Sequence, residues 1–400
     1  MLKYWVWLSY SLDPGSAHLI PLLNKYKTPK AIYETSISEL KSGYILTPGE
    51  LKRFNNKALD KSIRIIEQCE KFKINIIPFD SAQYPVGVKN IVNPSPCLYV
   101  KGVMQDLNNR PIICVVGQRK VSEYGKLVAW SLAGRLAAGG MTILSGGALG
   151  ADTAAHEGAL AVGGKSIAVL PCGINYDYLK TNLFLRRTIE DSGCLISEFP
   201  PETPLYKNAF QVRNRLLSAL SLGVVVVEAP ERSGALITAR HALEQGRDVY
   251  AVTGRAGDKN YAGCNSLLRD GAKPVFTADD IFCEYEQQFP NIIDIQKAKK
   301  TNLNMLYKAF HAPKIFDVEP KKLFDEDTVT EENKKIKKNI DETLPKCAEI
   351  VYNYIDTDLF TADDLINCGL PFEDVLSGIT QLELYGYIKA LPGGRYSIIQ

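Results

Sequence analysis

From Ile112 onward the chain repeats one pattern, in which a short and largely apolar run is followed by a glycine-rich turn and then by a helical segment. Short apolar strands that alternate with helices are typical of a parallel sheet that is covered by helices on both faces. The sequence therefore predicts an α/β fold with a doubly wound parallel sheet. The expected strands are Ile112–Val116, Thr142–Leu144, Ser166–Leu170, Cys194–Ser197, Val224–Glu228, Val249–Val252 and Lys273–Phe276.

The whole chain of 400 residues is longer than one core usually supports, so several domains are expected. Residues 1–105 show helical periodicity and close on the extended stretch "PSPCLYVKG", which predicts a small helical domain similar to SAM or helix-hairpin-helix domains. Residues 106–284 carry the alternating pattern, and residues 285–340 carry charges of both signs, as a linker does. Residues 341–400 read as three short helices and a hairpin, which predicts a winged-helix domain.

The formal net charge is only +2, so a nucleic-acid or membrane partner requires a local patch of positive charge. Nine scattered cysteines without a CxxC pair indicate free thiols of a reducing compartment, which predicts a cytoplasmic protein without structural zinc. The apolar opening is interrupted by Asp13 and lacks a cleavage pattern, and no apolar run is long enough to span a membrane. We therefore expect no secretory signal and no membrane partner.

Four glycine-containing loops follow predicted strands and are expected to meet at one edge of the sheet. They are Gly117-Gln118-Arg119, Ser145–Gly150, Gly173–Lys180 and Ser233-Gly234. In a parallel sheet the carboxyl ends of the strands share an edge, and ligands bind where the strand order reverses. Each loop precedes a helix whose N-terminal amides and dipole attract anions, which predicts a phosphate-bearing ligand. The alternative is that the glycines serve only tight turns and close packing.

The side chains at this edge narrow the class of ligand. No GxGxxG follows the first strand and no Walker A motif occurs, so NAD and ATP are disfavoured and no cofactor is expected. Cations are present instead, at Arg119, at Lys180 and in the run "FQVRNRLL", together with the aromatic rings of Tyr178 and Phe210. Guanidinium groups fit phosphate oxygens and rings stack on bases, which favours single-stranded nucleic acid. The alternative for Arg213 and Arg215 is a structural ion pair with Glu198 or Glu228.

Catalytic interpretations have less support. Asp152 and His156 share a helix face, but no third ligand stands at metal spacing and no GxSxG elbow supplies a nucleophile. We expect Asp152 to act as a partner of the helix dipole or to orient an arginine, and His156 to be packed inside the fold. Glu228 is a candidate general base, although pairing with a cation at the sheet edge explains it more simply. No catalytic or metal-binding residue is therefore predicted.

Several motifs together resemble the DNA processing protein A (DprA/Smf) family. They are, in order along the chain, "VVGQRKVSEYG", "LSGGALGADTAAHEGAL", "IAVLPCGINYDYLKTN", "LISEFPPETP", "FQVRNRLLSALS", "ERSGALITARHALEQGRDVYAVTG" and "GCNSLLRDGA". The resemblance covers the whole α/β region and, less specifically, both ends. It implies a Rossmann-like domain that binds single-stranded DNA without sequence preference, forms homodimers and helps to load the RecA recombinase during DNA uptake (transformation) and recombination. It implies no enzymatic activity.

The resemblance also implies roles for individual residues. Arg119 matches the arginine of a G-x-R loop, Lys180 the lysine of a Tyr-Pro-Lys-x-Asn loop, and Arg213-Asn214-Arg215 an Arg-Asn-Arg motif. Leu149, Leu179 and Thr253 depart from the family pattern, which implies a less basic pocket with a less rigid third loop. The residues expected to bind DNA are Gly117, Arg119, Ser145, Gly146, Gly147, Lys180, Asn182, Phe210, Arg213, Asn214, Arg215, Ser233, Gly234 and Thr238.

The C-terminal segment carries an unusual charge for a winged helix. Residues 344–400 contain three basic and eight acidic residues, and the recognition-helix position Pro371–Tyr385 has no Lys or Arg. Because a helix that reads duplex DNA needs cations against phosphate, we expect this domain to contact protein and not duplex DNA.

Two other classes of function compete with DNA binding. One is a nucleotide-processing enzyme, because related Rossmann-like folds host phosphoribohydrolases. Their usual signature is not met by "ERSGALITARHAL", which has Arg240 and His241 where acidic chemistry is needed. The other class is a pure protein scaffold, which leaves the cations at the sheet edge unexplained.

Overall fold

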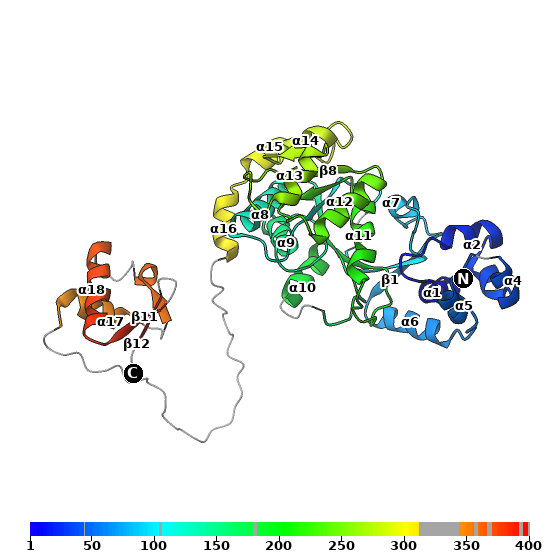
Figure 1. Cartoon of the computed structure of the whole chain (residues 1–400), viewed down its shortest axis with the longest axis horizontal. Helices are drawn as coiled ribbons and strands as arrows, with labels where there is room; N and C mark the ends of the chain where they lie inside the picture. Colours follow the sequence, from blue (N-terminus) through cyan, green and yellow to red (C-terminus); the bar gives the residue numbers. More distant parts are fainter. Residues whose placement is uncertain are drawn as a thin grey trace, which may run out of the picture. The chain divides into compact units, whose positions relative to one another are not determined.

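The structure is a computed structural model that describes residues 1–43, 45–103, 106–178, 182–311, 344–355, 359–365, 370–391 and 395–398. The chain divides into two compact units, residues 1–315 and residues 316–400, and each is described by itself (Figure 1).

A nine-stranded sheet forms the centre of the first unit, in the order β1-β2-β6-β5-β4-β3-β7-β8-β9. The strands from β6 across to β9 are parallel, whereas β1 and β2 are antiparallel additions beside β6. The parallel strands are β3 (Ile112–Val116), β4 (Thr142–Ser145), β5 (Ser166–Val169), β6 (Cys194–Ser197), β7 (Gly223–Val226), β8 (Asp248–Val252) and β9 (Lys273–Val275). The predicted doubly wound fold is confirmed, and the strand order reverses between β3 and β7.

Helices cover both faces of this sheet, as Figure 1 shows. Helices α8 and α9 pack on each other, and α11 and α12 pack on each other over other strands. The α8–α9 contact is close because Gly158 faces α8, where a Cβ would lie 2.0 Å from the Trp130 carbonyl oxygen. The helices of this region are α8 (Glu123–Ala138), α9 (Ala151–Ala161), α10 (Leu183–Ser192), α11 (Ala209–Ala219), α12 (Gly234–Glu244), α13 (Ala262–Arg269) and α14 (Asp279–Tyr285).

The N-terminal region is helical, as predicted, but it also supplies two strands to the sheet. Its helices are α1 (Leu2–Ser11), α2 (Leu19–Tyr26), α3 (Pro29–Glu34), α4 (Ile37–Ser42), α5 (Pro48–Phe54), α6 (Asp60–Lys71) and α7 (Val86–Lys89). The strands are β1 (Ile74–Pro78) and β2 (Cys97–Gly102). The stretch "PSPCLYVKG" therefore does not simply close a helical bundle. Strand β2 joins the sheet because β1 and β6 satisfy its backbone on both sides.

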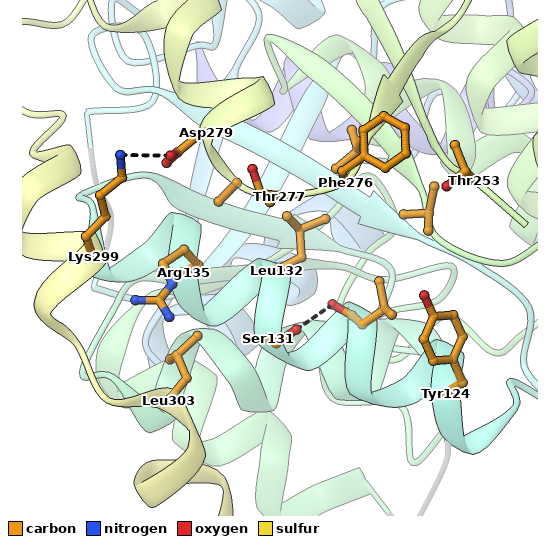
Figure 2. Close-up of a pocket in the computed structure, with 14 residues that line it drawn as sticks. Tyr124, Ser131, Leu132, Arg135, Thr253, Phe276, Thr277, Asp279, Lys299 and Leu303 are labelled. Carbon is orange, nitrogen blue, oxygen red and sulfur yellow. Dashed lines mark hydrogen bonds and ion pairs between the residues drawn. The ribbon is translucent and has the colours of Figure 1, made fainter.

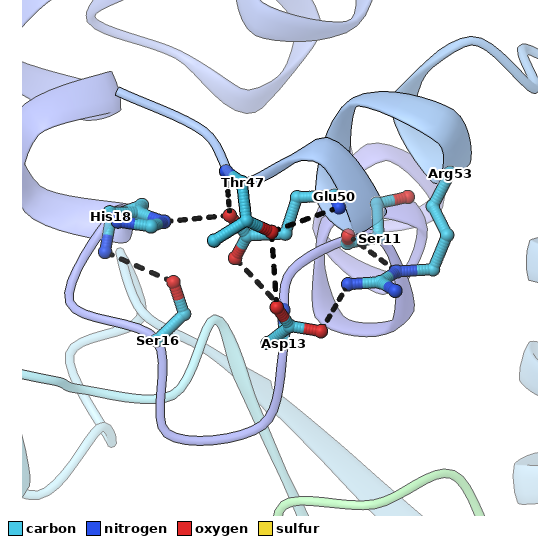
Figure 3. Close-up of polar contacts among 7 residues, drawn as sticks. All are labelled: Ser11, Asp13, Ser16, His18, Thr47, Glu50 and Arg53. Carbon is cyan, nitrogen blue, oxygen red and sulfur yellow. Dashed lines mark hydrogen bonds and ion pairs between the residues drawn. The ribbon is translucent and has the colours of Figure 1, made fainter. Parts of the chain in front are cut away.

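A buried carboxylate fastens the loop after α1 to the start of α5 (Figure 3). Glu50 is fully buried and accepts hydrogen bonds from the backbone amides of Asp13 (3.0 Å) and Thr47 (2.9 Å). Nδ1 of His18 lies 2.7 Å from the carboxylate, and the Ser16 side chain is a further hydrogen-bond partner. Burial acts to raise the pKa of Glu50, but these hydrogen bonds outweigh burial and leave the pKa below its ordinary value.

Replacing Glu50 by glutamine should lower the free energy of unfolding at neutral pH by about 1–3 kcal/mol, because buried donors lose a charged acceptor. A carboxyl whose pKa is lowered by folding stabilises the fold above its unfolded pKa, and this stabilisation is lost as the pH falls through the folded value. The difference between wild type and Glu50→Gln should therefore shrink below pH 4.5, the ordinary pKa. Urea unfolding at several pH values measures this effect. Glu39→Gln is the matched control, because Glu39 takes the same position in α4 but is exposed.

Two further helices belong to the first unit. They are α15 (Ile295–Lys300) and α16 (Leu303–His311), and both contact α8 or α9. Ala298 and Leu303 are buried in the main core, so this part of the charged stretch 285–340 is folded against the helical layer. Ile293, Leu306 and Tyr307 also pack against this core, so the start of the predicted linker is a folded part of the first unit.

The second unit has its own small core, formed by residues such as Val351, Tyr352, Val375, Ile379 and Leu382. Its elements are α17 (Lys346–Tyr354), β10 (Leu359–Thr361), the 3-10 helix η2 (Ala362–Leu365), α18 (Phe372–Leu384), β11 (Ile388–Leu391) and β12 (Arg395–Ile398). The three strands form an antiparallel sheet in the order β10-β12-β11. Helices followed by a β hairpin are the predicted winged-helix arrangement.

Two general features of the described residues complete the picture. None of the described helices combines the length and the apolar content needed to cross a membrane. The cysteines in the described part of the chain are free thiols, of which Cys69, Cys97, Cys114, Cys172, Cys194 and Cys264 are buried and Cys283 is exposed.

Candidate nucleic-acid interface

A pocket of about 390 Å³ lies where the strand order reverses. The loop after β3 and the segment after β7 form its two sides, α11 contributes a further wall, and Ala148 and Asp152 complete the described lining. Eight of the residues predicted to bind DNA line this pocket: Gly117, Arg119, Phe210, Arg213, Asn214, Ser233, Gly234 and Thr238. Residues from the loop after β3, from α11 and from the start of α12 thus meet at one site, at the place where doubly wound sheets bind ligands.

Arg119 is the most accessible of the predicted cations that the structure describes. Its side chain is exposed, and its guanidinium carbon lies 4.3 Å from the ring centre of Phe210. The Phe210 ring in turn packs edge-on against Tyr178, with 5.8 Å between the ring centres. Within the described residues, the Arg119 guanidinium makes no hydrogen bond or ion pair, so its five donors remain available to a ligand.

The pocket is more basic than the sequence predicted. Lys120 and Arg232 also line it, and both are exposed. Neither was named from the sequence, although Lys120 follows Arg119 directly and Arg232 immediately precedes the predicted Ser233-Gly234 turn. Asp152 is the single acidic residue of the described lining. The pocket therefore offers net positive charge although the whole chain is nearly neutral.

Arg213 forms the buried floor of the pocket. Its guanidinium donates hydrogen bonds to the carbonyl oxygens of Gly146 (2.7 Å) and Val169. A Cβ at Gly146 would come within 2.7 Å of both the Arg213 guanidinium and the Asp152 carboxylate, so glycine is required there. Burial raises the pKa of Asp152 while the charge of Arg213 opposes that rise, and burial lowers the pKa of Arg213. Asp152 therefore lies beside an arginine, which agrees with one of the two roles that the sequence predicted for it.

The glycine loop after β4 reaches the pocket through Ala148, but its predicted DNA-binding residues Ser145, Gly146 and Gly147 do not line it. Ser145 is fully buried and its hydroxyl donates to the Val115 carbonyl oxygen at 2.6 Å. The amide of Ala148 donates to the Asp152 carboxylate at 3.3 Å. Gly146 and Gly147 are also buried. The Asp152 side chain therefore takes a backbone donor that the sequence assigned to a phosphate, and Ser145, Gly146 and Gly147 are buried residues outside the pocket lining.

Three more of the predicted residues lie elsewhere. Arg215 is buried and donates to the Glu198 carboxylate, which is the structural ion pair considered as the alternative for this arginine. The Asn182 side chain is mostly buried and donates to the Thr153 hydroxyl at 2.9 Å. Lys180 lies outside the described residues.

The residues considered for catalysis, His156 and Glu228, are buried and hydrogen-bonded within the fold. His156 is fully buried with Nδ1 at 2.7 Å from the Ser166 hydroxyl, and burial, helped by the Arg213 charge, lowers its pKa to about 3. Within the part of the chain that the structure describes, Glu228 pairs with no cation, contrary to the simpler expectation, and it accepts hydrogen bonds from the loop that follows β3. Among the described residues, no cluster of His, Cys, Asp and Glu fits a metal ion.

A second pocket, of about 460 Å³, lies between α8, the ends of β8 and β9, and α15 (Figure 2). Its cations are engaged within the protein. Lys299 pairs with Asp279 at 2.9 Å, and Arg135 donates to the carbonyl oxygens of Ala298 and Thr301. This pocket is larger than the first, but it has fewer free donors for phosphate.

Comparison with known proteins places the chain in a family. The model of DNA recombination-mediator protein A matches residues 75–286, and the DprA winged-helix model matches residues 337–394. The chain is 40% identical over 225 residues to DNA processing protein DprA of Bacillus subtilis, which covers 56% of this chain and 76% of that protein. It is 33% identical over 344 residues to protein Smf of Escherichia coli, which covers 85% and 81% of the two chains.

A solved structure extends the comparison. DNA processing protein A from Streptococcus pneumoniae superposes with a TM-score of 0.61 at 29% sequence identity, over 70% of this chain and 97% of that one. The matched models span most of the sheet and the C-terminal unit, in the order that the sequence motifs predicted. The chain therefore belongs to the DNA recombination-mediator protein A family, also called DprA/Smf.

Proposed function

We propose that this protein is a recombination mediator that binds single-stranded DNA in the pocket between β3 and β7. The observation that carries the proposal is the exposed Arg119 guanidinium, which has no counter-charge among the described residues and rests on Phe210 at the strand-order reversal. Lys120 and Arg232 add two exposed cations beside it.

The pocket suits an unpaired strand better than a free nucleotide or a duplex. Cations that face solvent attract the sugar-phosphate backbone, and partly exposed rings such as Phe210 and Tyr178 offer stacking faces to bases that are not paired. In the described lining the only ionisable acid is Asp152, which is buried beside Arg213, and no histidine is present. The described lining therefore lacks an accessible carboxylate or imidazole for hydrolysis, which supports a binding protein over a phosphoribohydrolase.

Family membership supports the remaining parts of the proposal. We infer that the protein protects incoming single strands and helps to load the RecA recombinase, that it forms homodimers through its sheet domain, and that it acts in the cytoplasm. We further propose functional divisions at residues 1–105, 106–284, 285–340 and 341–400, with β1 and β2 linking the first of them to the sheet.

A labelled single-stranded oligonucleotide and the same sequence as a duplex test the proposal by fluorescence anisotropy at two salt concentrations. Tighter binding of the single strand, weakened at the higher salt concentration, is the expected result. Equal affinity for both forms, or release of free base from nucleoside monophosphates with no oligonucleotide binding, would argue for another function.

We also propose that the winged-helix domain contacts protein and not duplex DNA. On α18 the side chains of Glu373, Leu376 and Leu384 are exposed on one helical face, at the position where a DNA reader carries cations. Removal of residues 316–400 should leave the weak duplex affinity of the chain unchanged, because the first unit has its own cores. A clear drop in duplex affinity in the same anisotropy assay would show instead that this domain binds duplex DNA.

A further inference from the structure

We propose that Glu228 is a positioning residue that holds the Arg119 loop in its binding conformation. This inference rests on the proposed function, because it assigns Glu228 a role in single-strand binding through Arg119. Glu228 lies two residues beyond the end of β7, the strand that pairs with β3, and its side chain is fully buried. A buried carboxylate is costly unless hydrogen bonds compensate it, so its partners indicate what it is for.

The Glu228 carboxylate accepts hydrogen bonds from the loop that carries Arg119, and the Tyr261 hydroxyl also lies near it. One carboxylate oxygen accepts hydrogen bonds from the Gln118 side-chain amide and from the backbone amide of Ser122, the latter at 2.9 Å. The other oxygen accepts the Ser122 hydroxyl at 2.5 Å. The backbone carbonyl of Glu228 also accepts the Gln118 amide at 2.8 Å. Residues on both sides of Arg119 are therefore tied to one side chain, while Arg119 itself stays exposed.

The start of α8 is shaped around this carboxylate. Ser122 is the N-cap of α8, and its hydroxyl accepts the Gly125 amide at 3.0 Å. A Cβ at Gly125 would lie 2.1 Å from a carboxylate oxygen of Glu228, so the helix has space for the carboxylate only because residue 125 is glycine. The positive end of the α8 dipole also favours a negative group here. The loop, the cap and the glycine thus fit one buried anion.

Glu228 acts by positioning the Arg119 loop and does not contact DNA itself. Its side chain is sealed beneath Gln118 and Ser122, so a phosphate cannot reach it, and its negative charge would repel one. Without the carboxylate, the segment from Gly117 to Ser122 loses the acceptor that fixes its turn. The Arg119 side chain then samples many directions. Binding must therefore include the entropic cost of ordering it, which weakens the affinity for DNA.

The test is a double-mutant cycle between Glu228 and Arg119, read by the affinity for a fluorescent oligo(dT) strand. Glu228→Ala should weaken binding about tenfold in the wild-type background and have almost no effect in the Arg119→Ala background. Glu228→Gln should restore most of the affinity, because its amide oxygen still accepts from Ser122 and its NH₂ group donates to the Ser122 hydroxyl. Equal losses from Glu228→Ala in both backgrounds would overturn the positioning role.

A second variant displaces the carboxylate without removing it. Gly125→Ala should weaken oligo(dT) binding as Glu228→Ala does, although alanine is the better helix former. Gly49→Ala is the matched control, since Gly49 also lies in the first turn of a helix and the nearest atom to its added Cβ would be 3.6 Å away. Unchanged binding by Gly125→Ala would contradict the inference. Wild-type protein that fails to bind oligo(dT) would refute the proposed function itself, which separates the two failures.

Discussion

Replacing Arg119 by alanine should weaken single-strand binding about tenfold or more, because a charge-assisted hydrogen bond is lost. The Arg119 side chain is exposed and unpaired among the described residues, so its removal should leave the fold intact. The loss should be similar for all sequences, because a phosphate contact carries no base information. Anisotropy titrations with several oligonucleotides of one length measure it.

The salt dependence of binding separates a phosphate contact from a general loss of charge. The slope of log affinity against log salt should fall by about 0.7 for each single-strand phosphate contact removed. Arg64→Ala is the control, because Arg64 is an exposed arginine on α6 of the N-terminal region and its loss changes the net charge equally. If both variants bind and respond to salt alike, Arg119 has no specific contact with the strand.

Replacing Glu198 by alanine should lower the free energy of unfolding by about 3–5 kcal/mol, because the Arg215 guanidinium would stay buried without its counter-charge. The side chains of Arg215 and Glu198 are 3% and 4% exposed, so water cannot take the place of the lost partner. Burial raises the pKa of Glu198, and the charge of Arg215 opposes that rise. Urea unfolding of the wild type and the variant measures the difference.

A double variant distinguishes a buried ion pair from simple loss of packing. Glu198→Leu with Arg215→Met should be more stable than Glu198→Ala, because it leaves no unpaired charge inside the protein. The pair fastens α11, which also carries Phe210 and Arg213, to the end of β6. A loss of less than about 1 kcal/mol from Glu198→Ala would show that Arg215 finds another partner or reaches solvent.

The sheet was predictable because its strands are short apolar runs between glycine turns. Each predicted strand from Ile112 to Phe276 matches an observed strand within one or two residues. β1 was missed because Ile74–Pro78 directly follows a helix and has little apolar alternation. The helix α15 was missed because only Ala298 of its six residues is buried, so charge dominated its composition.

The site was predictable to the level of loops but not of side-chain directions. Sequence placed Arg119, Phe210 and the Ser233-Gly234 turn at one edge, and the structure brings them together. It had no means of showing that Asp152 takes the amide of Ala148 or that Arg215 turns toward Glu198, because both depend on packing between distant segments. Arg213 has both a predicted and an unpredicted role. It lines the pocket, as expected, and it also joins two segments by donating to the carbonyl oxygens of Gly146 and Val169.

The most direct test of the central claim maps where an unpaired strand lies on the protein. A bromodeoxyuridine-substituted single strand is irradiated in complex with the full chain, and the crosslinked peptides are identified by mass spectrometry. The pocket between β3 and β7 predicts adducts on the peptides that contain Phe210 and Tyr178, which should disappear with Arg119→Ala. Adducts confined to the peptides around Tyr124 and Phe276, at the second pocket, would contradict it.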